Sequence, residues 1–271
     1  MANNLLDQVF SRCRNENRAA LVGYLTAGDP NISDSTLLLH HLAIHADIIE
    51  IGMPFSDPMA DGAVIQAASE RALASGCTLA DVFSLTQSVR RQHPDVGIVL
   101  MGYANTPYSI GFESFAAQAA DAGANGVLLV DIPPEECGIC REAFQQHQLK
   151  QIFLLSPTSS EDRIQRVIEV ASGFIYYVAL TGVTGAELGE TSVIKARVEI
   201  LRQRTSIPIC VGFGIKTVEK AHEIACFSDG VVIGSAFVSI VTASDTKLFD
   251  ASDPLLKIAC NMRSAMKRPK K

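Results

Sequence analysis

The sequence predicts an α/β fold in which eight β/α units close into a single barrel, and three observations support this prediction. Short apolar runs rich in β-branched residues recur about every 30 residues along the chain, which is the length of one β/α unit. Some runs, such as 127–130 (VLLV), are apolar at every position, as parallel strands covered by helices are. Eight such units in 271 residues are typical of the (β/α)8 or TIM barrel, whose usual length is about 250 residues.

Each run is followed by turn residues and then by a stretch with helical character, so strands and helices alternate along the chain. We expect the eight strands to begin near Leu21, Ile48, Gly97, Val127, Ile152, Ile175, Pro208 and Val231. An open, doubly wound sheet is the alternative fold for this pattern. Its dinucleotide-binding form is disfavoured, because the glycines after the first and seventh runs do not form a G-x-G-x-x-G sequence that opens a helix.

Two additions to the regular barrel are expected. The second and third runs are farther apart than the average, and residues 63–73 and 79–89 between them both have helical patterns. With Gly76 as the expected C-cap, an added helix should follow strand 2. Residues 1–13 should form an extra N-terminal helix at the bottom of the barrel. Because the sequence contains no linker or low-complexity segment, we expect residues 1–271 to form one domain.

Composition and charge exclude several classes of protein. Hydrophobic residues make up 48% of the chain, which excludes intrinsic disorder. The formal net charge of -6 gives no general reason to bind nucleic acid or anionic lipid. Since no apolar run approaches the roughly 20 residues of a membrane span and the N-terminus lacks a secretory hydrophobic core, we expect a cytoplasmic protein. The seven scattered cysteines predict reduced, buried thiols.

The most informative segment is 49–62 (IEIGMPFSDPMADG), which contains a carboxylate inside an apolar strand. The two-residue period of a strand places Glu50 on the same face as Ile48 and Gly52, toward the barrel interior. Desolvation there would raise its pKa and suit it to general acid–base catalysis. A core glutamate paired with a cation is the structural alternative. We favour catalysis because barrel enzymes carry catalytic groups at the C-terminal ends of strands.

Asp61 could bring a second carboxylate to the same end of the barrel. It ends a loop rich in proline and aspartate and precedes a helix. This position is also typical of a helix N-cap, and Asp57 has the same ambiguity. Two carboxylates in different environments can divide the roles of acid and base. We therefore expect Glu50 and Asp61 to form the catalytic pair.

Three glycine-containing turns late in the chain predict a phosphate site. They are 182–185 after the sixth run, 212–214 after the seventh and 234–235 after the eighth. In β/α barrels, the loops after strands 7 and 8 and the start of a short helix bind phosphate through backbone N–H groups, which glycine leaves accessible. We expect Ser235 and Ala236 to open that helix.

Six segments, spread in order along the chain, resemble the tryptophan synthase alpha chain family. They are LTAGDP (25–30), IEIGMPFSDPMADG (49–62), DIPPEE (131–136), TGVTGAE (181–187), VGFGI (211–215) and IGSA (233–236). PFSDP and ADG together with GVTG and GFGI are a specific combination, and the absence of tryptophan is also similar to that family. The resemblance implies a TIM-barrel lyase that splits indole-3-glycerol phosphate into indole and glyceraldehyde 3-phosphate in tryptophan biosynthesis.

The resemblance also implies roles for individual residues. It implies that Glu50 and Asp61 are catalytic. The substrate-binding residues that it implies are Tyr24, Tyr176, Thr184, Gly185, Gly214, Gly234 and Ser235. Tyr24 stands where relatives carry a phenylalanine against the indole ring. One departure from the family is Leu180, where some members have an arginine.

A partner is implied as well: a β subunit that carries pyridoxal phosphate (PLP) and receives indole within an αββα heterotetramer. The implied contact residues are Pro54, Asp57, Pro58, Asn105 and Pro133, although prolines and aspartates are also ordinary turn residues. No cofactor and no metal is expected in this chain. Three alternatives stay open: an activating subunit with weak activity alone, a stand-alone indole-releasing lyase, and a different phosphosugar isomerase on the same barrel.

Overall fold

The computed structural model describes residues 4–179, 190–212, 214–243 and 248–269. Eight parallel strands form a closed barrel in which neighbouring strands pair in sequence order and β1 pairs with β8. The strands are β1 (Ala20–Thr26), β2 (Ile48–Gly52), β3 (Gly97–Gly102), β4 (Gly126–Leu129), β5 (Lys150–Leu155), β6 (Ile175–Val178), β7 (Ile209–Gly212) and β8 (Gly230–Ile233). The predicted TIM barrel is confirmed, and each strand begins within two residues of its expected start.

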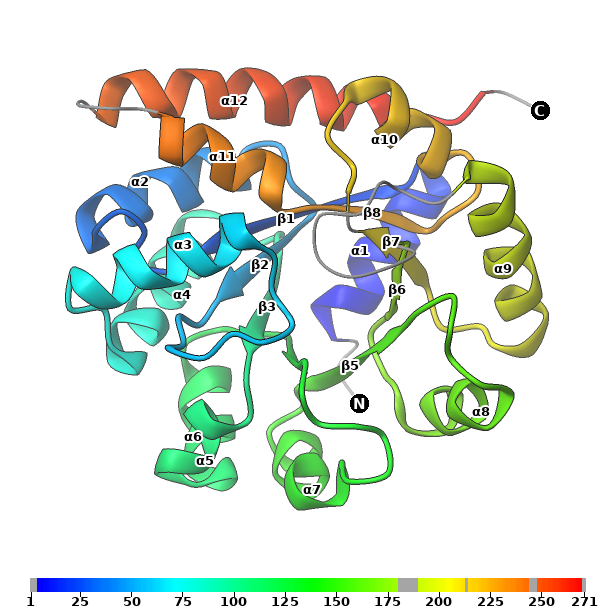
Figure 1. Ribbon diagram of the computed structural model, residues 1–271, viewed down its shortest axis with the longest axis horizontal. Coiled ribbons are helices and arrows are strands. Elements are labelled where there is room, and N and C mark those ends of the chain that lie inside the picture. Colours follow the sequence, from blue (N-terminus) through cyan, green and yellow to red (C-terminus); the bar gives the residue numbers. More distant parts are fainter. Residues whose placement is uncertain (1–3, 180–189, 213, 244–247, 270–271) are drawn as a thin grey trace.

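Helices form a ring around the barrel, as Figure 1 shows. They are α1 (Leu5–Asn15), α2 (Ile32–Ala43), α3 (Ala63–Ala74), α4 (Leu79–Gln92), α5 (Asn105–Ile110), α6 (Phe112–Asp121), α7 (Gly138–Gln146), α8 (Glu161–Val170), α9 (Thr191–Arg204), α10 (Val218–Ala225), α11 (Ser235–Ala243) and α12 (Leu248–Ala265). The added helix after β2 is confirmed: α3 ends at its C-cap Ser75, and Gly76 follows with φ +85°.

Two helices, α5 and α12, were not predicted from the sequence. Helix α5 has six residues, too few for a clear amphipathic period. Helix α12 contains Pro254, a residue that normally ends a helix. It packs across α2, α10 and α11 on the outside of the barrel.

The strand register determines which side chains point into the barrel. Tyr24 on β1 pairs with Glu50 on β2, and Glu50 pairs with Val99 on β3. Residue 23 has the opposite orientation, because a Cβ added to Gly23 would lie 2.8 Å from Leu42 of α2. Since side chains alternate along a strand, Tyr24, Glu50 and Val99 face the interior.

Helix α1 closes the N-terminal end of the barrel, as expected. Its N-cap is Asn4, whose side chain accepts the Leu6 N–H at 2.9 Å. The Leu6 side chain is fully buried at the end of the barrel. Glycines make room for it: an added Cβ would lie within 3.3 Å of Leu6 at Gly97, Gly126 and Gly173.

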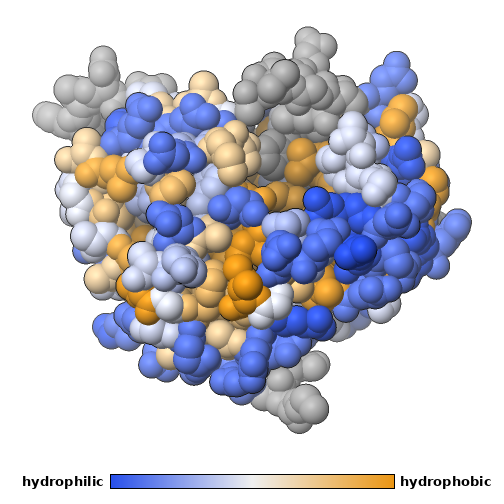
Figure 2. Space-filling model, turned by 60° about the horizontal axis from the view of Figure 1, so that its bottom comes forward, coloured by the Kyte–Doolittle hydropathy of each residue, from blue (hydrophilic) through white to orange (hydrophobic). Residues whose placement is uncertain are grey.

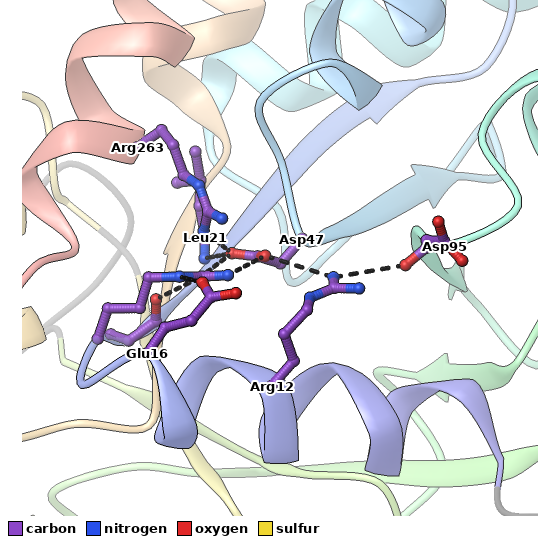
Figure 3. A network of polar contacts seen from close by, with 8 residues as sticks. Arg12, Glu16, Leu21, Asp47, Asp95 and Arg263 are labelled. Atoms are coloured by element: carbon purple, nitrogen blue, oxygen red, sulfur yellow. Dashed lines mark hydrogen bonds and ion pairs between the residues drawn. The ribbon is translucent and has the colours of Figure 1, made fainter.

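A buried ionic network joins α12 and the start of β1 to the residue before β2 (Figure 3). Asp47 is 2% exposed and accepts hydrogen bonds from the Arg18 guanidinium at 2.7 and 2.9 Å. The Leu21 N–H donates to the same carboxylate at 2.9 Å, and Arg263 of α12 donates to it as well. The network satisfies the buried Asp47 carboxylate, so removal of one of its arginines would leave a buried charge without compensation.

Five of the seven cysteines are buried, whereas Cys226 and Cys260 are exposed. The prediction of buried thiols therefore holds for five positions and is wrong for two. All seven are free thiols. Within the described ranges, each helix is too short or too polar to span a lipid bilayer.

Candidate active site

Glu50 lies in the interior of the barrel with its carboxyl group out of water. The residue is 1% exposed, and its Oε1 has no hydrogen-bond partner in the part of the chain that the structure describes. Desolvation raises the pKa of Glu50 to about 8. The alternative of a core glutamate paired with a cation is not observed, because no described arginine or lysine forms an ion pair with it. At pH 7 the group is therefore mostly a neutral carboxylic acid.

Asp61 lies in the loop between β2 and α3 and is 8% exposed. The Tyr103 hydroxyl donates a hydrogen bond to its Oδ2 at 3.1 Å. The N-cap of α3 is Gly62, so the alternative of Asp61 as an N-cap is wrong. Burial raises the pKa of Asp61 to about 6, while the hydrogen bond from Tyr103 lowers it. Asp61 is thus mostly ionised at pH 7.

The two expected substrate tyrosines share this region with the two carboxyl groups. Burial is the largest cause of the raised pKa of Tyr24. The negative charge of Asp61 raises this pKa further, and that of Glu50 raises it more weakly. Burial is also the largest cause of the raised pKa of Tyr176. The negative charge of Glu50 raises this pKa further, and that of Asp61 raises it more weakly. Tyr24 also pairs in register with Glu50 on the neighbouring strand, and both tyrosines are buried.

Glycines on neighbouring strands make space for the tyrosine rings. A Cβ added to Gly52 would lie 2.1 Å from the Tyr24 hydroxyl oxygen. One added to Gly212 would lie 2.5 Å from the Tyr176 hydroxyl oxygen. A larger residue at either position would require the tyrosine ring beside it to shift.

The expected phosphate site lies at the start of α11. As predicted, this helix begins at Ser235, directly after Gly234, and both residues are half-buried. The first N–H groups of a helix have no intrahelical acceptor, and they favour an anion. A Cβ at Gly234 would be in ordinary contact, 3.6 Å from Tyr24, so packing does not require glycine there. By contrast, Gly214 has φ +77°, which favours glycine for backbone reasons.

Thr184, Gly185 and Leu180 lie outside the described residues. The expected partner residues are all placed: Asp57 and Asn105 are exposed, and the prolines at 54, 58 and 133 are half-buried. Pro54, Asp57 and Pro58 lie in the loop after β2, and Pro133 lies in the loop after β4. Asn105 is the first residue of α5, which follows β3, and these three strands are neighbours in the barrel.

Tyr103 is a site residue that the sequence interpretation missed. It directly follows β3, and its hydroxyl accepts the Ala60 N–H at 3.0 Å while donating to Asp61. Its ring stacks on Phe55 with the centroids 5.3 Å apart. Tyr103, which follows β3, thus fixes the loop after β2 that carries Asp61. Its position directly after a predicted strand, where barrel enzymes carry site residues, could have indicated Tyr103 from the sequence.

The fold and the site define a class of protein: a TIM-barrel enzyme with two buried carboxyl groups of different pKa at the C-terminal end of the barrel. A sequence model of the tryptophan synthase alpha chain family matches residues 10–267. The tryptophan synthase alpha chain of Alkalilimnicola ehrlichii is 47% identical over 237 residues, covering 87% of this chain and 86% of the relative. The tryptophan synthase alpha chain of Zymomonas mobilis is 43% identical over 263 residues, covering 97% of this chain and 96% of the relative.

Solved structures agree with these relatives. Tryptophan synthase subunit alpha from Legionella pneumophila superposes with a TM-score of 0.86 at 37% identity, covering 98% of this chain and 99% of that one. A chain of tryptophan synthase from Mycobacterium tuberculosis superposes with a TM-score of 0.87 at 30% sequence identity, and the match covers 97% of this chain and 98% of that one. This chain therefore belongs to the tryptophan synthase alpha chain family, lyases that act on indole-3-glycerol phosphate in tryptophan biosynthesis.

Tyr103→Phe tests the contact with Asp61. The change keeps the ring stack on Phe55 but removes the hydrogen bond that lowers the pKa of Asp61. That pKa should rise, so the acidic limb of the pH–activity profile should move upward by about one pH unit. Tyr108→Phe, on the exposed surface of α5, is the matched control. An acidic limb that stays in place would show that the contact does not influence the reaction.

Proposed function

We propose that this chain releases indole and glyceraldehyde 3-phosphate by a retro-aldol reaction in which Glu50 moves the protons. The observation that carries this proposal is the burial of Glu50, with a pKa of about 8 and an Oε1 that has no partner among the described atoms. A neutral carboxylic acid can donate a proton to C3 of the indole ring. The carboxylate that results is a base held in the same place.

The reaction requires three proton-dependent events, and two carboxyl groups suffice for them. When Glu50 protonates C3, positive charge develops at N1, and the Asp61 carboxylate stabilises it by accepting a hydrogen bond from N1–H. Glu50 then takes the proton of the side-chain hydroxyl. The bond between C3 and the side chain breaks, its electron pair returns to the ring, and the hydroxyl carbon becomes the aldehyde. Glu50 ends in its starting protonation state.

The substrate is proposed to lie across the C-terminal end of the barrel. Tyr24 and Tyr176 would contact the indole ring, since both are buried beside Glu50 and Asp61. The phosphate would lie at the other end, on the N–H groups of Gly214, Gly234 and Ser235. The family resemblance adds Thr184 and Gly185 to the phosphate site.

We also propose that a β subunit binds the loops after β2, β3 and β4. These loops are connected, because the Ala104 N–H donates to Asp131 Oδ1 at 2.8 Å and Tyr103 contacts the loop after β2. Met59 on the loop after β2 is 78% exposed and Ile139 of α7 is 58% exposed, so both apolar side chains would be available to pack against the proposed partner. Figure 2 shows hydrophobic residues between hydrophilic ones on the side of the molecule that carries α5 to α7.

The proposed contact residues are Pro54, Asp57, Pro58, Asn105 and Pro133. The partner would carry PLP, receive indole directly and form an αββα heterotetramer with this chain. A solved relative bears the name tryptophan synthase, without restriction to one subunit, which supports an assembly of this kind.

Substitution of the two carboxylates tests the catalytic roles. Glu50→Gln and Asp61→Asn keep size and hydrogen-bonding capacity, so both variants should fold with unchanged thermal denaturation. Indole release should fall by about 10²- to 10⁴-fold in each. Glu169→Gln, an exposed glutamate of α8, is the control. Near-normal turnover in either site variant would remove that residue from its proposed role.

Gly234 offers a test of the phosphate site. Gly234→Asp places a negative charge beside the proposed anion, so KM for indole-3-glycerol phosphate should rise about ten- to hundredfold. Gly234→Ala adds a Cβ that the fold accommodates in ordinary contact, and it controls for the loss of glycine. If Gly234→Asp leaves KM unchanged, the phosphate binds elsewhere.

A mixing assay tests the partner and separates the alternatives. Indole formation is measured with the isolated chain and again after addition of a PLP-loaded β subunit, with light scattering to follow assembly. We expect a complex with two copies of each chain and faster indole formation, both weakened in Met59→Asp. Full activity as a monomer without stimulation would favour a stand-alone lyase, whereas activation of the partner without indole release would favour an activating subunit.

A further inference from the structure

The turn after β1 joins helices that lie far apart in the sequence. Asp29 in this turn is 4% exposed, and Arg71 in the last turn of α3 donates to both of its carboxylate oxygens at 2.8 Å. The Gly28 N–H donates to Ser35 Oγ of α2 at 3.0 Å. Ser75 Oγ, at the end of α3, donates to the Gly28 carbonyl at 3.2 Å. The turn is therefore fixed against both α2 and α3.

Arg71 also reaches α11. Its Nη2 donates to Thr242 Oγ1 at 3.0 Å, in the last turn of that helix. Thr242 Oγ1 in turn donates to the Val238 carbonyl at 3.1 Å. The donors of a guanidinium have a rigid planar arrangement, so one side chain holds the Asp29 carboxylate and α11 in a fixed relation.

Helices α3 and α11 both begin at the C-terminal end of the barrel and both end beside Arg71. Helix α3 starts two residues after Asp61, and α11 starts at Ser235. The two helices pack against each other, as Figure 1 shows. The nine residues of α11 make it about 13 Å long, so a change of tilt at its last turn moves its first turn.

We propose that Arg71 is a positioning residue for the phosphate group of the substrate. By joining Asp29 to Thr242, it sets the direction of α11 and hence the place of the N–H groups of Gly234 and Ser235 relative to Asp61. The inference rests on the proposed phosphate role of the α11 N-terminus. Thr242 is exposed, so its hydrogen bond contributes little to folding, and its loss should affect substrate binding instead.

Thr242→Val is the primary test, because it removes only the α11 end of the connection and leaves the pair of Arg71 and Asp29 intact. We expect KM for indole-3-glycerol phosphate and the inhibition constant of inorganic phosphate to rise about three- to tenfold. The value of kcat should change less than about twofold, and the melting temperature should not change. Ser239→Ala, on an exposed position of the same helix, is the matched control.

Arg71→Lys provides a second variant, because an ammonium group retains the charge but not the planar fork. It should raise KM as Thr242→Val does, and the double variant should be no worse than the more impaired single variant. Independent, additive effects would contradict a shared connection. A fall in kcat together with a lower melting temperature would indicate a purely structural role and would overturn the proposal.

Gly234→Asp separates this inference from the proposed function on which it rests. If Gly234→Asp raises KM while Thr242→Val and Arg71→Lys do not, the phosphate site stands and the positioning role of Arg71 is wrong. If Gly234→Asp also has no effect, the phosphate does not bind at the start of α11, and the positioning role fails with it.

Discussion

Closure of the parallel barrel around an uncompensated carboxyl group is the constraint on which the proposed chemistry depends. Glu50 pairs in register with Tyr24 on one side and Val99 on the other, so neither neighbouring strand supplies a cation. In bulk water this group would ionise near its ordinary pKa; within the barrel, desolvation keeps it protonated up to about pH 8. The same closure brings Asp61, with a pKa of about 6, to the same end of the barrel.

The buried carboxyl groups at the two ends of the barrel differ in their hydrogen-bond partners. At the N-terminal end, Asp47 is buried with arginines and a main-chain N–H that satisfy its carboxylate, and Leu6 fills the space inside the strands. At the C-terminal end, Glu50 keeps an Oε1 without a partner in the described part of the chain. A barrel stabilised at one end can hold a group at the other whose environment is unfavourable for stability and suited to proton transfer.

The site is also held together across neighbouring β/α units. Tyr103, after β3, fixes the loop that carries Asp61, and Arg71, at the end of α3, contacts both the turn after β1 and α11. Each contact joins an element that carries a proposed site residue to the rest of the barrel. In the proposed site, the placement of the acid, the base and the anion-binding groups would therefore depend on Tyr103 and Arg71, which are not among the residues proposed to bind the substrate.

Local patterns in the sequence were enough to predict the eight strands, the added helices at the N-terminus and after β2, and the inward direction of Glu50, because burial and side-chain period are properties of consecutive residues. Segment resemblance supplied the candidate roles. Only the tertiary structure decided that Asp61 accepts a hydrogen bond from Tyr103, 42 residues away, rather than capping α3, and that Arg71 reaches Thr242, 171 residues away. Such contacts arise when the barrel closes, and no local period encodes which distant residues meet.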